Sequence, residues 1–331
     1  ALTTSVGLKP DSPLDQMFQG GQAQRNLTRL PDRPWLSASS IDLEGFDLGA
    51  AVEEILAIIP NEGETAFLNQ SLAASLPMIK LARAAATAYY VPQQGAIMGG
   101  GLINGVTVIE SDDAPAFLAA NESYLKALSE MVMAMPADAA NPGGPPRQLA
   151  FSTQYREGAL RVDGVRVDQF QVQVNLPPDV MQQAGQALML TGGTGQSGYL
   201  AAIGDHAVMT TTTDAQMIKI ALHALRENRG LGAGGPIPRV RKAMMPPNLV
   251  AESYLNVAGL AQMFNQVMLL FNPRSPMVLD APPELPPLAL GVGAENGTVA
   301  ARFYVPNEVI RFVKESVDTL MPPAGGTNNA N

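Results

Sequence analysis

The chain has 331 residues, no cysteine and two histidines, and its formal net charge is −9. Net negative charge disfavours binding to nucleic acid or to an anionic membrane surface, because both need clustered positive charge. The lack of cysteine excludes disulfides, thiolate nucleophiles and cysteine-held zinc. Charged residues make up only 15% of the chain, against roughly a quarter in an ordinary globular protein. One interpretation is that part of the surface is covered by a protein partner or by another copy of the chain. The other is an alanine-rich exported protein, which has the same composition without such cover.

Residues 1–34 have no hydrophobic period and contain several prolines and a Gly-Gly pair. This composition predicts an extended Pro-rich arm, which has to lie on its own body or on a neighbouring molecule. A first α+β portion is predicted for residues 35–228. It begins with an alternating strand at Trp35–Ile41 and a helix that ends before Pro60. The Ala-rich stretch Glu64–Ala88 then predicts a long helix with a kink at Pro77, or two helices.

A hairpin followed by a helix recurs along the chain. The first unit is Ala96–Val132, with its turn at Asn104–Gly105. The second is Gly198–Asn228, which turns near His206, and the third is Leu288–Leu320. The recurrence predicts an α+β fold, in which an antiparallel sheet is packed with helices, and an internal pseudo-repeat of hairpin–helix units.

Between these units, Leu149–Tyr155 and Arg161–Leu176 predict a further hairpin, and the run after Pro177 predicts a helix to about Leu190. Residues 229–249 predict a Gly/Pro/Arg-rich linker. Residues 250–322 predict a second α+β portion that completes the same body, with a strand at Ala251–Val257 and a helix at Leu260–Phe271. Residues 323–331 predict a flexible tail.

Two stretches of this second portion are Tyr254-Leu-Asn-Val-Ala-Gly-Leu and Leu290-Gly-Val-Gly-Ala-Glu-Asn-Gly-Thr-Val-Ala-Ala-Arg-Phe. They resemble exported bacterial α+β proteins built from repeated strand–helix and hairpin–helix units. The resemblance implies an α+β fold outside the cytoplasm and carries over no catalytic residue. The first residue, Ala1, fits cleavage of a signal peptide as well as removal of an initiator methionine.

Basic residues gather around the loop Gly230–Pro238. They are Arg226, Arg229, Arg239, Arg241 and Lys242. One interpretation is a solvated connection between two portions of the chain. The other is a basic docking surface for an acidic surface on a partner or on the same chain, and these five residues are the candidate interaction site.

No catalytic, cofactor-binding or metal-binding residue is predicted. The segment around Ser197 resembles a nucleophile elbow, but Tyr199 stands where the elbow needs glycine. The two histidines, His206 and His223, show no ligand spacing for a metal. The methionines at Met131 and Met133 fit packing better than a copper site.

Three functions remain open from the sequence. The first is a non-enzymatic exported protein, periplasmic or on the cell surface of a bacterium, that acts through protein contacts as an assembly or scaffold subunit. The second is a protein that binds a small or hydrophobic ligand between sheet and helices. The third is a hydrolase that uses His206 with Asp205. No cofactor is expected, nor any membrane-spanning segment, because no apolar run is long enough.

Overall fold

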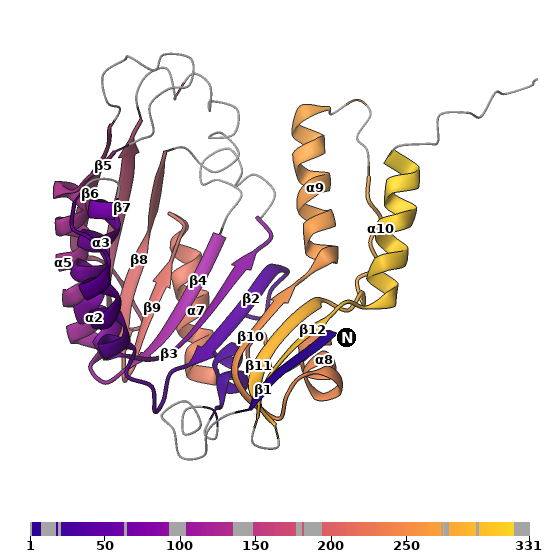
Figure 1. Cartoon of the computed structure of the whole chain (residues 1–331). Helices are drawn as coiled ribbons and strands as arrows, with labels where there is room; N and C mark the ends of the chain where they lie inside the picture. Colours follow the sequence, from indigo (N-terminus) through magenta and orange to yellow (C-terminus); the bar gives the residue numbers. More distant parts are fainter. Residues whose placement is uncertain are drawn as a thin grey trace, which may run out of the picture.

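The computed structural model describes residues 2–7, 18, 21–62, 65–92, 104–134, 148–176, 181, 194–272, 274, 278–295 and 298–320. These residues form a 12-stranded antiparallel sheet with helices against it (Figure 1). The predicted α+β class is therefore confirmed. In the described part of the chain, the sheet order is β1-β12-β11-β10-β2-β3-β4-β9-β8-β7-β6-β5.

The strands are β1 (Leu2–Gly7), β2 (Trp35–Asp42), β3 (Ala82–Tyr90), β4 (Asn104–Ser111), β5 (Val132–Ala134), β6 (Gln148–Val162), β7 (Val165–Asn175), β8 (Gly195–Ile203), β9 (His206–Thr210), β10 (Asn248–Leu255), β11 (Leu288–Glu295) and β12 (Thr298–Tyr304). The helices are η1 (Ala23–Arg29, a 3-10 helix), α2 (Leu48–Ile58), α3 (Ala66–Leu81), α5 (Ala114–Glu130), α7 (Ala215–Glu227), α8 (Pro236–Met244), α9 (Val257–Phe271) and α10 (Asn307–Leu320). Several begin at a side-chain cap that the sequence provides: Asp113 caps α5, Asp214 caps α7 and Asn256 caps α9.

One face of the sheet, which we call the back face, carries the main core. It contacts η1, α7 and α8, and the buried cluster includes Leu27 from η1, Leu222 from α7 and Ile237 from α8. Small and β-branched residues of the central strands, such as Ala86 and Val108, point into this cluster. Alternation along each strand therefore sends the intervening side chains to the opposite, front face.

Among the described residues, helices cover the front face at its two ends. At one end α5 packs on β7 and β8 through Leu125, Phe170 and Leu200. Helix α3 lies beside α5, and α2 lies beside α3. At the other end α9 and α10 pack around Leu285 in a small separate cluster. Figure 1 shows the sheet curving between the α2–α3–α5 group and the α9–α10 pair, with the front of β2, β3, β10 and β11 between them.

The arm predicted for residues 1–34 is partly built into the body. β1 pairs with β12 of the same chain, and η1 places Ala23 and Leu27 in the main core, where Leu30 is also fully buried. The apolar residues of this segment follow no helical or strand period, so the sequence pattern did not reveal that three of them reach the core together.

Three local predictions differ from the structure. The second half of the Ala-rich stretch is strand β3, because pairing with β2 and β4 outweighs the helix propensity of alanine. Asn104–Gly105 opens strand β4 and is not a turn. The expected linker 229–249 contains α8, which starts at Pro236, a residue well suited to a first helical position. The second and third hairpin–helix units form as predicted, as β8–β9–α7 and β11–β12–α10.

The internal pseudo-repeat stays a prediction. The helix expected after Pro177 and the tail at 323–331 lie outside the described residues, apart from Met181.

Candidate functional site

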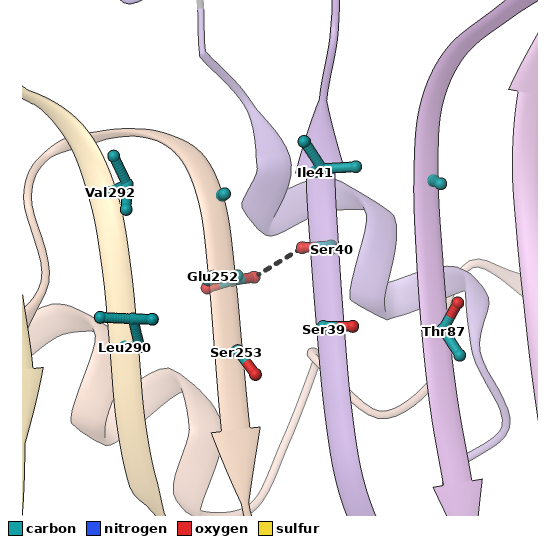
Figure 2. Close-up of a pocket in the computed structure, with 10 residues that line it drawn as sticks. Ser39, Ser40, Ile41, Thr87, Glu252, Ser253, Leu290 and Val292 are labelled. Carbon is teal, nitrogen blue, oxygen red and sulfur yellow. Dashed lines mark hydrogen bonds between the residues drawn. The ribbon is translucent and has the colours of Figure 1, made fainter. Parts of the chain in front are cut away.

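The uncovered part of the front face is hollowed across four strands. A cavity of about 280 Å³ lies there, and we call it the front-face groove. Figure 2 shows the residues of the groove as sticks on β11, β10, β2 and β3. The side chains that point to the front are Ser39, Ile41, Ala85, Thr87, Ala251, Ser253, Leu290 and Val292.

A row of hydroxyl side chains crosses the floor of the groove on β10, β2 and β3, and it continues beyond the groove to β4. Ser253 on β10 is paired with Ser39 on β2, and Ser39 is paired with Thr87 on β3. Thr87 is in turn paired with Thr107 on β4, and their hydroxyls lie 3.0 Å apart. No hydrogen bond to another described residue is found for the hydroxyls of Ser39 and Ser253. We call this row the hydroxyl ladder.

An apolar row runs parallel to the hydroxyl ladder. On each strand its residue lies two positions away from the hydroxyl residue. Val292 is paired with Ala251, Ala251 with Ile41, Ile41 with Ala85, and Ala85 with Ile109. Side chains two residues apart on a strand share a face and lie about 7 Å apart. The groove thus has one edge with the hydroxyls of Ser253, Ser39 and Thr87, which ends at Leu290 on β11, and one apolar edge, and no side chain in either row is charged.

The carboxylate nearest to the groove is turned to the other side of the sheet. Glu252 lies between Ala251 and Ser253, but its side chain is 0% exposed. It accepts two hydrogen bonds from Arg241, of 2.7 and 2.8 Å, and one from the hydroxyl of Tyr254. Figure 2 shows its contact with Ser40, which also points to the back face. Burial and the nearby carboxylate raise the pKa of the Tyr254 phenol, so this phenol stays a donor.

Large apolar side chains continue along the front face beyond the groove. The row of the hydroxyl ladder extends through Leu290 to Phe303 on β12 and Leu2 on β1, and all three are exposed. Leu2 is 76% exposed, on a strand that forms one edge of the sheet. On α10, Ile310, Val313 and Val317 form an exposed apolar stripe at helical spacing.

The predicted basic cluster is divided by the structure. Arg226 pairs with Asp163 at 3.0 Å, and Arg239 lies 3.8 Å from Glu284. Arg241 is turned inward to Glu252 and is a structural residue of the back face. Arg229 and Lys242 are exposed. A docking role for the exposed members of the cluster stays a prediction.

His206 lies next to Asp205, the residue with which the hydrolase hypothesis combines it. Its Nδ1 lies 2.5 Å from Oδ1 of Asp205, whereas its Nε2 is buried without a hydrogen-bond partner among the described residues. Glu110 is 3.9 Å from Nε2, and Arg29 pairs with Glu110. Burial lowers the pKa of His206, as does the nearby Arg29 guanidinium, while Asp205 and Glu110 act in the opposite direction.

The other sequence candidates are also placed in structural positions. Ser197 lies inside strand β8 and not on a sharp turn, so it lacks the geometry of a nucleophile elbow. His223 is exposed on α7, where it pairs with Glu227 at 3.2 Å. Met131 ends α5 in the interior, and Met133 lies in β5. Among the described residues, no group of three or more His, Asp or Glu side chains could hold a metal ion, and no helix is long and apolar enough to cross a membrane.

A second cavity, of about 560 Å³, lies between α5 and the β6–β7 hairpin. Its polar wall is a closed network around Asp168. The carboxylate of Asp168 accepts hydrogen bonds from the Tyr155 hydroxyl at 2.8 Å, the Gly158 backbone amide at 2.6 Å and Nε of Arg166 at 2.9 Å. Every oxygen of Asp168 is therefore already used, which favours a structural role for this wall.

The front-face groove was not predicted from the sequence. Its residues come from segments as far apart as Ser39 and Ser253, and only strand pairing brings them together. A weak signal exists in β2, where Ser37, Ser39 and Ile41 alternate with the buried residues of the strand. Comparison with protein-family models, with curated proteins and with solved structures finds no match to this chain.

Proposed function

We propose that this chain is a non-enzymatic binding protein that holds an apolar molecule in the front-face groove. The observation that carries the proposal is a hollow on a sheet face where the described side chains that point into it are apolar or hydroxylic, and where no helix among the described residues lies over it. Pockets for small molecules are mostly apolar, with a few placed polar groups, and usually measure about 300–1,000 Å³. The cavity of about 280 Å³ lies just below that range and suits a small ligand.

The position of the groove also supports a ligand of limited width. The α2–α3–α5 group stands on one side of the open front face, and α9 with α10 stands on the other (Figure 1). A broad flat surface has to clear both groups before it reaches the floor. A narrow molecule meets no such obstacle. Burial of apolar surface then supplies the driving force, at about 25 cal/mol per Å².

A charge placed in the groove tests this proposal. We expect Ser39→Asp to abolish binding of an uncharged apolar naphthylamine dye, because a carboxylate on the floor has to lose water without gaining a cation. The matched control is Ser129→Asp on α5, where the serine is exposed and far along the chain from the groove strands. Dye fluorescence and native mass spectrometry after mild purification are the measurements. Dye binding that is equal in the wild type and Ser39→Asp contradicts the proposal.

Protein contact is the second candidate function, as an assembly or scaffold subunit of an exported complex. The apolar surface that continues over β12 and β1, and the stripe on α10, favours it, because exposed apolar patches of this kind mark interaction sites. Edge strand β1 has no charge and no proline, so nothing in it opposes pairing with another chain.

Removal of residues 1–34 does not test this second candidate, because it also removes core residues such as Leu27. The sharper variant is Leu2→Lys with Val6→Lys, which alters the front side of β1 alone. The matched control is Thr3→Lys with Ser5→Lys on the other side of the strand. Light scattering is expected to show an oligomer for wild type and control, and a monomer for the first variant. A wild-type monomer without a co-purified partner argues against protein contact.

A further inference from the structure

We infer that the front-face groove selects an uncharged ligand with hydroxyl or carbonyl groups along one edge and an apolar body along the other. This inference rests on the proposed function and adds the chemical class of the ligand. The observation behind it is the parallel arrangement of the hydroxyl ladder and the apolar row on one open sheet face.

The hydroxyl ladder provides hydrogen-bond partners at regular spacing. Neighbouring strands lie about 4.8 Å apart, so four hydroxyls on adjacent strands span about 14 Å. Each serine or threonine hydroxyl can donate one hydrogen bond and accept two. Thr87 and Thr107 use one such bond between themselves, whereas Ser39 and Ser253 have none to another described residue. A ligand group that lies over β10 and β2 therefore finds two unused hydroxyls.

The apolar row sets the character of the rest of the ligand. Ile41 is 38% exposed, between Ala251 and Ala85, and Val292 extends the row toward β11. Because Ala251 and Ala85 carry only methyl groups, their side chains project little from the sheet, and a ligand can lie flat across the strands. A ligand with an apolar edge about 7 Å from a polar edge matches both rows at once.

The electrostatics of the groove favour a neutral ligand over an ion. A carboxylate on the ligand loses its hydration in the groove and meets no cation among the described residues that line it, because Arg241 lies behind β10 in its pair with Glu252. An ammonium group meets no carboxylate from these residues either, since the side chain of Glu252 is fully buried on the back face. A hydroxyl or carbonyl group of the ligand can replace its hydrogen bonds to water by hydrogen bonds to the serine hydroxyls, and it carries no charge that has to lose its hydration.

The test compares three molecules of equal chain length: decanol, decanoate and decane. Each displaces the uncharged naphthylamine dye from the full chain at neutral pH, where the carboxylate is ionised. We expect decanol to bind at least about tenfold more tightly than decanoate. Ser39→Ala and Ser253→Ala are each expected to weaken decanol about two- to tenfold, the usual effect of one lost hydrogen bond, and to leave decane unchanged. Ser129→Ala, a serine on α5, is the control.

The outcomes separate this inference from the proposed function. The inference is overturned if decanol and decanoate bind equally, or if neither serine variant affects the binding of decanol. Either result still agrees with the proposed function, the binding of an apolar molecule. Failure of all three molecules to displace the dye overturns the inference together with the proposed function. Folding of each variant is checked by its urea midpoint, which is expected to stay at the wild-type value because both serines lie on the open face.

Discussion

Arg241 on α8 and Glu252 on β10 form a two-pronged ion pair directly behind the front-face groove, with N–O distances of 2.8 and 2.7 Å. The carboxylate is fully buried and the guanidinium is 16% exposed. The hydroxyl of Tyr254 supplies a third hydrogen bond to the same carboxylate. The pair therefore fixes α8 to the strand that carries Ser253, and it keeps the charge of Glu252 away from the open face.

Arg241→Leu is expected to destabilise the protein by about 3–5 kcal/mol, because it leaves a buried carboxylate without its cation. Urea unfolding gives the free energy of unfolding for the comparison. The matched control is Arg239→Leu on the same helix. The Arg239 guanidinium is mostly exposed and lies 3.8 Å from Glu284, so no measurable loss is expected. Equal losses for the two variants would contradict the assignment of Arg241 to the interior.

The sequence predicts individual helices, caps and turns better than it predicts which strands pair with one another. The caps at Asp113 and Asp214, and the turn near His206, were all readable from local patterns. Strand β3 was not, because its run of alanines favours a helix locally and only pairing with β2 and β4 reveals its alternation. Register between distant strands is the information that local patterns lack.

The same reason explains why the basic cluster was visible and the groove was not. Arg239, Arg241 and Lys242 are close in sequence, so the cluster of charge can be recognised from the sequence alone. The sequence does not show which of these side chains point to solvent and which point inward. The structure turns Arg241 inward and leaves Arg239 outside. In contrast, Ser39 and Ser253 are separated by most of the chain, and neither stands out in its own segment.

His206 is expected to make the protein less stable in mild acid. Burial, followed by Arg29, lowers its pKa below the ordinary value of 6.5, although Asp205 and Glu110 oppose this. The unfolded chain therefore binds the proton more readily than the folded chain. Stability is fully present above about pH 6.5 and falls as the pH drops below it toward the folded pKa.

The measurement is the free energy of unfolding from pH 7.5 down to 5, for the wild type and for His206→Gln. We expect the variant to show a shallower fall with pH. His223→Gln on the exposed side of α7 is the control. Its free energy of unfolding is expected to fall with pH as in the wild type, because His206 is unchanged. A wild-type slope in His206→Gln would show that another group causes the acid sensitivity.

Asp168 is expected to contribute stability that disappears at lower pH. Burial alone raises its pKa, but hydrogen bonds from the Gly158 amide, the Tyr155 hydroxyl and Arg166, with the charge of Arg166, lower the pKa below 3.8. The folded carboxylate is thus harder to protonate than the unfolded one. Its contribution is present above about pH 3.8 and is lost as the pH falls through the lower, folded pKa.

Asp168→Asn tests this assignment, since the amide keeps the size of the side chain but carries no charge. We expect the variant to be less stable than the wild type at neutral pH and to lose less stability on acidification. Unfolding by urea at several pH values between 7 and 3 measures both effects. Equal acid sensitivity in the two proteins would mean that the Asp168 network contributes nothing to the pH dependence.

Gly198 on β8 is expected to tolerate no side chain. A Cβ atom built at this position overlaps the backbone carbonyl of Thr210 on β9, a group that cannot move without disturbing the sheet. We expect Gly198→Ala to destabilise the protein by about 1–3 kcal/mol, the usual effect of overpacking a well-filled interior.

The control is Gly234→Ala, where no atom lies within 4 Å of the new methyl group. There the loss of chain entropy in the unfolded state predicts no change, or a gain of about 0.4–1 kcal/mol. Urea midpoints measure both variants, and an unchanged midpoint in Gly198→Ala would show that β8 and β9 can separate locally at this point.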